Sequence, residues 1–266
     1  MLDWNPALYL HYANERTRPA AELLARVPQL EARHVVDLGC GPGNSTELLV
    51  QRFAAARVTG LDNSPSMLEQ ARQQLPTASF ALADIVSWAS DLQTAGPAPD
   101  LIYANASLQW VGGHEALIPR LFARLAAGGV LAIQMPDNRQ EPTHALMREV
   151  AALPQFAAHI GDAASVRTGI LPIRAYYDLL AAPDACAQSI DVWHTVYQHP
   201  MESAEAIVQW VRGTGLKPFV EALPESLQQE FLNQYLSRVE QAYEQRADGR
   251  RLLAFPRLFI VAQRKA

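Results

Sequence analysis

The stretch of the sequence with the clearest chemical meaning is a glycine-rich loop in VVDLGCGPGNST, residues 35–46. Gly39, Gly41 and Gly43 fall on alternate positions, shortly after the acid Asp37. Glycine between a strand and a helix lets the backbone approach a nucleotide closely, because no side chain stands in the way. The loop therefore predicts a site for a nucleotide or a related molecule.

The spacing of the glycines argues against a dinucleotide. Dinucleotide-binding loops follow the pattern G-x-G-x-x-G, whereas this loop reads G-x-G-x-G and has Asn44 where the third glycine belongs. Asp37 would also be a poor neighbour for a pyrophosphate and suits a cationic ligand better. A nicotinamide-dependent dehydrogenase is therefore disfavoured.

Two more acids follow at the ends of predicted strands. Asp62 ends the strand 57–62, where a carboxylate can accept hydrogen bonds from both hydroxyls of a ribose. Asp84 ends the strand 78–84, where it could meet the amino group of an adenine. Each acid could instead be a turn residue or a helix cap. Three acids at successive strand ends nevertheless favour a ligand site at the carboxyl edge of a parallel sheet.

The elements around these acids alternate between strand and helix, which predicts an α/β fold with a parallel sheet covered on both faces. The expected strands are 34–38, 57–62, 78–84, 100–105 and 130–136, and the expected helices are 20–31, 45–54, 64–75 and 116–129, the last ended by a glycine pair. Ser64 and Pro65 are a strong helix start.

After Pro136 the pattern changes. Residues 137–185 read as helices and loops without a clear strand, and the segment 190–199 alternates like a strand. His194 alternates there with valines, which predicts a buried core histidine. Further helices at 203–215 and 225–246 and a last strand at 257–265 complete the expected elements.

Composition limits the classes of protein that remain. The chain has 266 residues, 49% hydrophobic and 18% charged, with a net charge of -5, as in soluble globular proteins and unlike most nucleic-acid binders. No apolar run is long enough for a membrane span, and the start lacks the pattern of a secretory signal. Cys40 and Cys186 are too few for a disulfide framework or a metal cluster. We therefore expect a cytoplasmic, enzyme-sized protein without a metal.

Residues 33–136 resemble the class I S-adenosylmethionine-dependent methyltransferases. The resemblance is carried by D-L-G-C-G-P-G, by L-D-N-S with Met67 after it, by A-D-I and by N-A-S-L-Q-W. It implies a Rossmann-like, seven-stranded sheet that is mostly parallel with an antiparallel last strand. It also implies one domain over 1–266, with a cofactor-binding half at 1–136 and helical insertions at 137–185 and 200–246 that form a substrate cap.

By this resemblance the cofactor is S-adenosyl-L-methionine. The loop backbone at Gly39 would contact its methionine part, Asp62 its ribose, and Asp84 and Ile85 its adenine. The full set of residues expected to bind the cofactor is Tyr12, Arg18, Asp37, Gly39, Cys40, Gly41, Asn44, Asp62, Asn63, Met67, Asp84, Ile85 and Asn105.

Stretches outside the generic fold extend the resemblance to methyltransferases that esterify a small tricarboxylate. They include WVRGTGLKPF and DGRRLLAFPRLFIVAQR near the end of the chain. A carboxylate is already ionised at neutral pH, so its methylation needs alignment and removal of water but no general base. We therefore assign no catalytic acid or base and expect Asn105, Gln109 and Trp110 to line the transfer site.

A tricarboxylate needs cationic partners, and the arginine guanidinium binds carboxylates in a bidentate manner. Candidate arginines outside the generic fold are Arg139, Arg148, Arg167, Arg174, Arg212, Arg250 and Arg251. The residues expected to bind the substrate are Trp4, Tyr9, Trp110, Arg139, Arg174, Tyr176, Tyr177, Tyr197 and Arg212. For each of them, packing or solvent exposure is the alternative reading.

Three alternatives remain open. The first is a methyltransferase of the same fold with another substrate, such as another small carboxylate, an acyl group on a carrier protein, an alcohol or an amine. The second is the dehydrogenase, and the third is a cofactor-sensing protein without catalysis. The sequence indicates a small-molecule partner and neither a nucleic acid nor a membrane, and it does not determine the oligomeric state.

Overall fold

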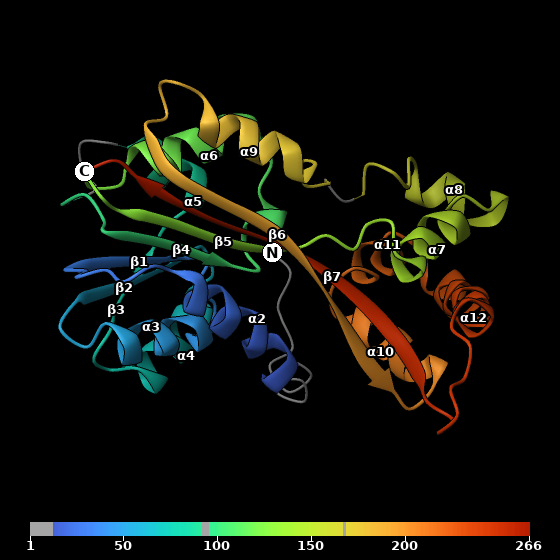
Figure 1. The fold of residues 1–266 in the computed structure, drawn as a ribbon. Coiled ribbons are helices and arrows are strands. Elements are labelled where there is room, and N and C mark those ends of the chain that lie inside the picture. The colour runs from blue at the N-terminus through green and yellow to red at the C-terminus, as the bar shows by residue number, and fades with distance from the viewer. Residues whose placement is uncertain (1–12, 92–95, 167–168) are drawn as a thin grey trace. The chain divides into compact units, whose positions relative to one another are not determined.

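The computed structural model describes residues 13–91, 96–166 and 169–266. Within these residues the strands form one seven-stranded sheet in the order β3-β2-β1-β4-β5-β7-β6 (Figure 1). The strands are β1 (His34–Leu38), β2 (Arg57–Asp62), β3 (Ser79–Leu82), β4 (Leu101–Asn105), β5 (Val130–Pro136), β6 (Ala187–Met201) and β7 (Arg251–Arg264).

The first five strands are parallel, and β7 runs antiparallel to its neighbours (Figure 1). The predicted fold class is therefore confirmed, with its antiparallel last strand. In the register of the sheet, Asp37 of β1 lies opposite Gly60 of β2 and Tyr103 of β4. The carboxyl ends of β1, β2 and β4 consequently lie at the same edge of the sheet, where the glycine loop begins.

Contacts divide the chain into two compact units, which we describe separately. Unit 2 contains residues 13–136, 170–195 and 258–266, and unit 1 contains 137–169 and 196–257 among the described residues. Both β6 and β7 contribute residues to each unit. The sequence did not predict this division, and it assigned residues 170–185 to the cap, whereas the structure packs them in unit 2.

Helices cover both faces of the unit 2 sheet (Figure 1). One face carries α2 (Ala13–Arg26), α3 (Asn44–Arg52) and α4 (Pro65–Gln74), and the other carries α5 (Ile85–Ser90), α6 (His114–Ala123) and α9 (Ile173–Ala181). The predicted start of α4 is confirmed, because the Ser64 hydroxyl accepts a hydrogen bond from the Met67 amide and Pro65 is the first helical residue.

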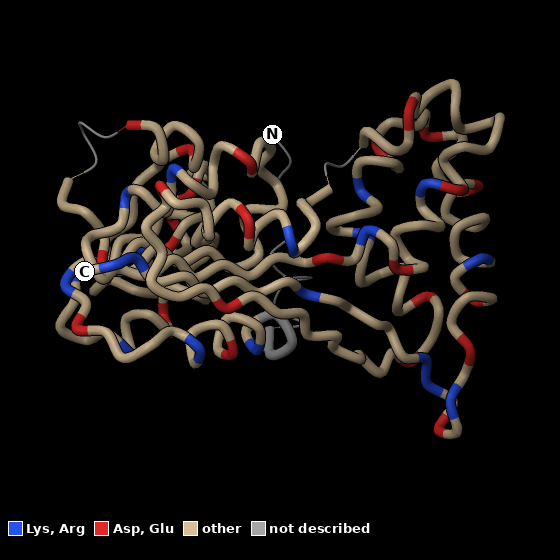
Figure 2. The backbone as a smooth tube through the Cα atoms, turned by 45° about the horizontal axis from the view of Figure 1, so that its top comes forward, with Lys and Arg blue, Asp and Glu red and all other residues tan. Residues whose placement is uncertain are grey.

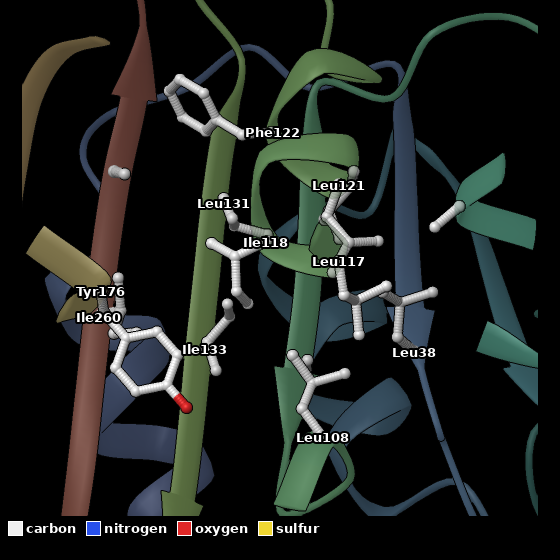
Figure 3. Close-up of a cluster of buried hydrophobic side chains, with 14 of the residues drawn as sticks. Leu38, Leu108, Leu117, Ile118, Leu121, Phe122, Leu131, Ile133, Tyr176 and Ile260 are labelled. Carbon is white, nitrogen blue, oxygen red and sulfur yellow. The ribbon is translucent and has the colours of Figure 1, made fainter. Parts of the chain in front are cut away.

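The core of unit 2 lies between the sheet and the helices α5, α6 and α9 on its second face. Figure 3 shows Ile118 of α6 beside Leu131 and Ile133 of β5, and Leu117 of the same helix beside Leu38 of β1, all fully or almost fully buried. Such a continuous apolar interface is what a parallel strand buried on both faces requires. It fixes the positions of the strand ends, and therefore of the site.

Unit 1 is built mostly from helices around a core of its own. Its helices are α7 (Pro142–Ala151), α8 (Pro154–Ile160), α10 (Ala204–Arg212), α11 (Lys217–Glu221) and α12 (Glu225–Ala242). Phe156 of α8 and Phe231 of α12 meet edge to face, with ring centroids 5.2 Å apart. The predicted helices 203–215 and 225–246 correspond to α10 and α12.

Three local predictions were wrong. Helix α6 ends at Ala123, well before the glycine pair at 128–129, because Arg124 already caps it. Strand β7 begins at Arg251 and not at residue 257. His194 is exposed on β6 and is not a buried core histidine, whereas Tyr197 on the other face of the strand is buried.

Charged side chains are mixed along the described backbone. Lys and Arg alternate with Asp and Glu in both units and do not gather into a basic stripe among the residues drawn (Figure 2). Within the described ranges, no helix is both long and apolar enough to cross a membrane.

Candidate functional site

The glycine loop connects β1 to α3 in a conformation that favours glycine. The φ angles of Gly39, Gly41 and Gly43 are +66°, +54° and +101°, which residues with a Cβ rarely adopt. The Gly39 and Cys40 amides both donate to the carbonyl of Leu61, at 2.7 and 3.0 Å. These bonds hold the loop against the end of β2.

Gly39 also lies against the turn that follows β4. A Cβ at this position would stand 2.4 Å from the Cβ of Ser107, far inside van der Waals contact. The Ser107 hydroxyl donates to the Leu38 carbonyl at 2.7 Å. The glycine therefore allows two chain segments of the site to pack directly on each other.

Asp37 is fully buried below the loop. Its Oδ2 accepts hydrogen bonds from the Ser45 and Thr46 hydroxyls, at 2.8 and 2.7 Å. Burial, opposed by these bonds and reinforced by the charge of Asp62, raises the pKa of Asp37 to about 6. The carboxylate is thus charged at neutral pH in a setting that would attract a cation.

Asp62 bonds to the backbone on both sides of the site. Its Oδ2 accepts the Gly41 amide and its Oδ1 accepts the Ser64 amide, each at 2.9 Å. A carboxylate oxygen has a second lone pair, so both oxygens can still accept a bond from a ligand. Asn63 beside it is exposed, and Met67 is half-buried.

Asp84 has the capping role that the sequence left open. Its Oδ1 accepts the Ser87 amide at 2.9 Å and starts α5. The apolar side chains of Leu82 and Val86 on either side of it are 62% and 39% exposed. Exposed apolar groups beside a carboxylate suit the flat face and the amino group of a purine.

The turn after β4 is held in a strained conformation. Ala106 has a φ of +52°, although it is not a glycine. Its amide donates to the Gln134 carbonyl at 2.9 Å, and its own carbonyl accepts the Gln109 side-chain amide at 2.7 Å. Such outliers persist where the surroundings enforce them, often at functional sites. The 3-10 helix η1 (Leu108–Trp110) follows directly.

Three buried oxygens of this region have no hydrogen-bond partner among the described residues: Asp37 Oδ1, Asn105 Oδ1 and Gln109 Oε1. Buried acceptors without donors are rare in folded proteins and call for an explanation, such as a ligand or water. All three are acceptors, so a ligand with N–H groups or positive charge fits them. Trp110 is 47% exposed at the end of η1.

Cys40 is buried beside Gly60 and is not activated. Burial, followed by the charges of Asp37 and Asp62, raises the pKa of its thiol well above the usual value. Asn44 is the first residue of α3. No cluster of metal-ligating side chains is present in the part of the chain that the structure describes.

Of the predicted substrate residues of unit 2, Trp110 lies on η1 and the other three lie on α9. Arg174 and Tyr177 are exposed there, but Tyr176 is fully buried. The Tyr176 hydroxyl lies 2.5 Å from His114 Nδ1 and accepts the Leu171 amide at 3.1 Å. The prediction that this hydroxyl donates to a substrate is therefore wrong, because the hydroxyl is used inside the protein.

The predicted substrate residues of unit 1 are distributed over several elements. Tyr197 is buried on β6, with the Arg257 guanidinium 5.8 Å from its ring, and Arg212 is exposed at the end of α10. Arg250 pairs with Glu202, and Arg251 donates to carbonyls at the end of α12. The last two side chains therefore have structural partners.

Two arginines of unit 1 lie close together. Arg139 donates to the Ala164 carbonyl at 2.6 Å, and Arg148 of α7 donates to the His144 carbonyl at 3.0 Å. Burial and then the positive charge of Arg139 lower the pKa of Arg148. Two neighbouring, partly desolvated guanidinium groups would be stabilised by an anion.

Several predicted residues lie outside the described residues: Trp4, Tyr9, Tyr12 and Arg167. Arg18 is described on α2, where it pairs with Glu22 at 2.7 Å. Sequence reasoning missed Ser45, Thr46, Ser107 and His114, which bond to residues of the site. The Ser-Thr pair right after the loop could have been connected with Asp37, whereas the role of His114 had no local signal.

The comparisons with known proteins agree with this geometry. Residues 35–129 match the family described as Methyltransferase domain. The YcgJ protein of Bacillus subtilis has a similar fold, with a TM-score of 0.57 and 12% identity over 94% of this chain and 99% of the other. Phosphoethanolamine N-methyltransferase 2 of Haemonchus contortus, solved with S-adenosylhomocysteine, gives a TM-score of 0.53 and 15% identity over 94% of this chain and 53% of the other. Fold and domain define a class I methyltransferase.

Sequence relatives specify the branch of this class. The chain is 74% identical to trans-aconitate 2-methyltransferase of Delftia acidovorans and 67% identical to that of Paracidovorax citrulli, over the full length of both proteins in each case. It belongs to the trans-aconitate 2-methyltransferase family.

We predict that Gly39→Ala destabilises the fold more than Gly41→Ala. Both glycines have positive φ, so each alanine costs about 1 kcal/mol of backbone strain. Only at position 39 does the new Cβ meet Ser107, while at position 41 nothing lies within 4 Å of it. We expect at least about 1 kcal/mol of additional loss for Gly39→Ala in urea denaturation. Equal losses would show that the close approach of the two segments does not matter.

We also predict that Asp37 couples cofactor binding to pH. Affinity for S-adenosylhomocysteine, measured by calorimetry, should fall as the pH drops through about 6, because protonation removes the charge that attracts the ligand's ammonium group. Asp37→Asn should bind more weakly at neutral pH and lose this dependence.

The free energy of unfolding of Asp37→Asn provides a second, independent test that the pKa of Asp37 is raised. The pKa of Asp37 in the folded protein lies above that of an ordinary aspartate, so the buried charge lowers stability fully above about pH 6 and progressively less below it. Asp37→Asn should therefore be more stable than the wild type at neutral pH, by at most about 3 kcal/mol, and the gap should close in acid. A wild type whose affinity is flat across this range would contradict the assignment.

Proposed function

We propose that this protein transfers a methyl group from S-adenosyl-L-methionine to a carboxylate of trans-aconitate, giving a monomethyl ester and S-adenosylhomocysteine. The observation that carries the proposal is the 74% identity to a trans-aconitate 2-methyltransferase across the whole of both chains. Identity at this level extends through the insertions that distinguish this family from other proteins of the fold, where substrate residues are expected.

The residues around the glycine loop fit the cofactor. When bound, S-adenosylmethionine supplies a methyl group on a positively charged sulfur. Asp37, Asn105 and Gln109 each contribute a buried oxygen without a hydrogen-bond partner in the described part of the chain, which suits the ammonium group and the positive charge of the methionine part. Asp62 has lone pairs for the ribose hydroxyls, and Asp84, with Leu82 and Val86, suits the adenine.

Methylation of a carboxylate requires no proton transfer by a side chain of the protein. A substrate carboxylate is ionised at neutral pH, so no side chain has to remove a proton from it. What the residues must supply is orientation of the carboxylate and exclusion of water from its oxygen. We assign the lining of the transfer site to Asn105, Gln109 and Trp110, and regard the enforced turn at Ala106 as the device that holds them.

The substrate charges call for arginines. Arg174 of α9 is exposed and remains our candidate in unit 2. In unit 1 the neighbouring Arg139 and Arg148 form a second candidate, because a carboxylate would stabilise a guanidinium whose pKa is lowered first by burial and then by the charge of Arg139. Tyr177 is exposed near Arg174 and can still donate a hydrogen bond to an acid.

The test of the proposal is an assay of S-adenosylhomocysteine release over a panel of acceptors. The panel contains trans-aconitate, cis-aconitate, isocitrate, a malonyl thioester and simple amines. The expected result is turnover led by trans-aconitate. Turnover led by another carboxylate would overturn the substrate and keep the class, and turnover of amines alone would overturn carboxylate methylation.

We predict that Arg174→Ala raises the KM for trans-aconitate about ten-fold or more while the KM for S-adenosylmethionine changes less than about two-fold. Loss of a guanidinium that binds a carboxylate weakens the acid and leaves the cofactor untouched. The matched control is Arg120→Ala, which removes an exposed arginine of α6 that donates a long hydrogen bond to the Ser90 hydroxyl, at 3.3 Å. Equal changes in both KM values would exclude Arg174 from the substrate site.

A further inference from the structure

His114 and Tyr176 form a buried polar pair inside the apolar core of unit 2. Tyr176 is fully buried and His114 is 4% exposed. Figure 3 shows the Tyr176 ring beside Ile260 and Ile133. A polar pair in such surroundings is costly unless each of its polar atoms is bonded. Its position in the core therefore requires a reason.

For a neutral imidazole ring, the bonds of this pair run in one direction. His114 Nε2 lies 2.9 Å from the carbonyl oxygen of Leu108, which can only accept, so Nε2 carries the proton. In the neutral ring Nδ1 then accepts, and the Tyr176 hydroxyl at 2.5 Å must donate to it. The tyrosine oxygen in turn accepts the Leu171 amide at 3.1 Å. The relay thus runs from Leu171 through Tyr176 and His114 to Leu108.

The end of the relay is the element that carries the predicted transfer-site residues. Leu108 is the first residue of η1, and Gln109 and Trp110 are the other two. The Leu108 carbonyl accepts both His114 Nε2 and the Val111 amide, the latter at 2.8 Å. A single 3-10 turn has too few internal bonds to be rigid alone. Its anchoring must come from outside, and His114 provides it.

The relay also complements the strained turn before η1. Ala106 is held by Gln134 and Gln109, and Ser107 by the carbonyl of Leu38. With His114 on Leu108, the consecutive residues 106, 107 and 108 are each tied to a partner by a hydrogen bond. An element tied at every residue is preorganised, which is how enzymes avoid reorganisation at the moment of reaction.

We infer that His114 and Tyr176 are positioning residues for methyl transfer: their buried relay fixes η1 and, through it, Gln109 and Trp110. Neither residue acts on the substrate. The Tyr176 hydroxyl sets the tautomer of His114, and that tautomer presents the N–H that holds η1. The inference rests on the proposed function only where turnover is concerned, because the position of η1 can be observed without any substrate.

The first test compares Tyr176→Phe with Tyr235→Phe. Tyr235 is also fully buried, and its hydroxyl donates to the Thr143 carbonyl at 2.9 Å in unit 1, so it controls for the loss of a buried tyrosine hydroxyl. We expect Tyr176→Phe to lower kcat about ten-fold, with the KM for S-adenosylmethionine changed less than about three-fold. Tyr235→Phe should keep kcat within about two-fold of the wild type, although its melting temperature falls.

The second test reads the position of η1 directly. Tyr176→Phe should change the tryptophan emission spectrum, and the change should vanish when the same substitution is made in a Trp110→Phe background. The inference would be overturned if the emission spectrum did not change, or if the change persisted in the Trp110→Phe background. An equal loss of kcat in Tyr176→Phe and Tyr235→Phe would overturn it as well. If no acceptor in the assay panel is methylated, the proposed function fails and the emission comparison alone decides.

A further variant keeps the test valid if Tyr176→Phe does not fold. His114→Gln retains one donor and one acceptor and should preserve part of the anchoring of η1. We expect the kcat of His114→Gln to lie between that of the wild type and that of His114→Ala. The Trp110-dependent change in emission should likewise be smaller for His114→Gln than for His114→Ala. A kcat for His114→Ala equal to that of the wild type, with unchanged emission, would contradict the relay.

Discussion

The close contact between Gly39 and Ser107 is the constraint on which the site depends. It joins the loop after β1 to the turn after β4, two segments that are 68 positions apart in the chain, at a separation that leaves no room for a single methyl group. The segments follow two strands that pair in parallel, so the buried oxygens of Asp37 on β1 and Asn105 on β4 lie at the same edge of the sheet. The parallel core underneath holds this edge in place, and the strain at Ala106 is tolerated because neighbouring bonds enforce it.

The fold could be predicted from the sequence where local signals and burial agree. The strands around Asp37 and Asp62 are short apolar runs bounded by turns, and Ser64 with Pro65 starts a helix by rules that need no tertiary information. Strand β6 shows the limit of such rules. Alternation identified it as a strand, but it could not tell which face would be covered, because both faces carry apolar residues. The face that carries Trp193 is covered because this ring stacks on Phe259 of β7, at 4.9 Å between ring centroids. This contact depends on a residue far along the chain, which local alternation cannot reveal.

The candidate site could be predicted to a similar extent. The acids at strand ends follow from the spacing, and their hydrogen-bond partners lie nearby in the chain, as Ser45 and Thr46 do for Asp37. Tyr176 could not be placed, because a tyrosine near an arginine on a helix can face either solvent or core. Its burial follows from the packing of α9 on α6, which brings Tyr176 to His114, a residue 62 positions earlier in the chain. Side-chain roles that depend on contacts between helices need the fold first.

The strand order also has a consequence for the biosynthesis of the protein. Strand β7, made last, lies between β5 and β6, which are made much earlier. Until β7 has been made, β5 and β6 each present an unpaired edge, and open edges are templates for pairing with other chains. The nascent chain therefore cannot close its sheet before β7 has left the ribosome. A chain that lacks β7 would keep both edges open and would be prone to aggregate.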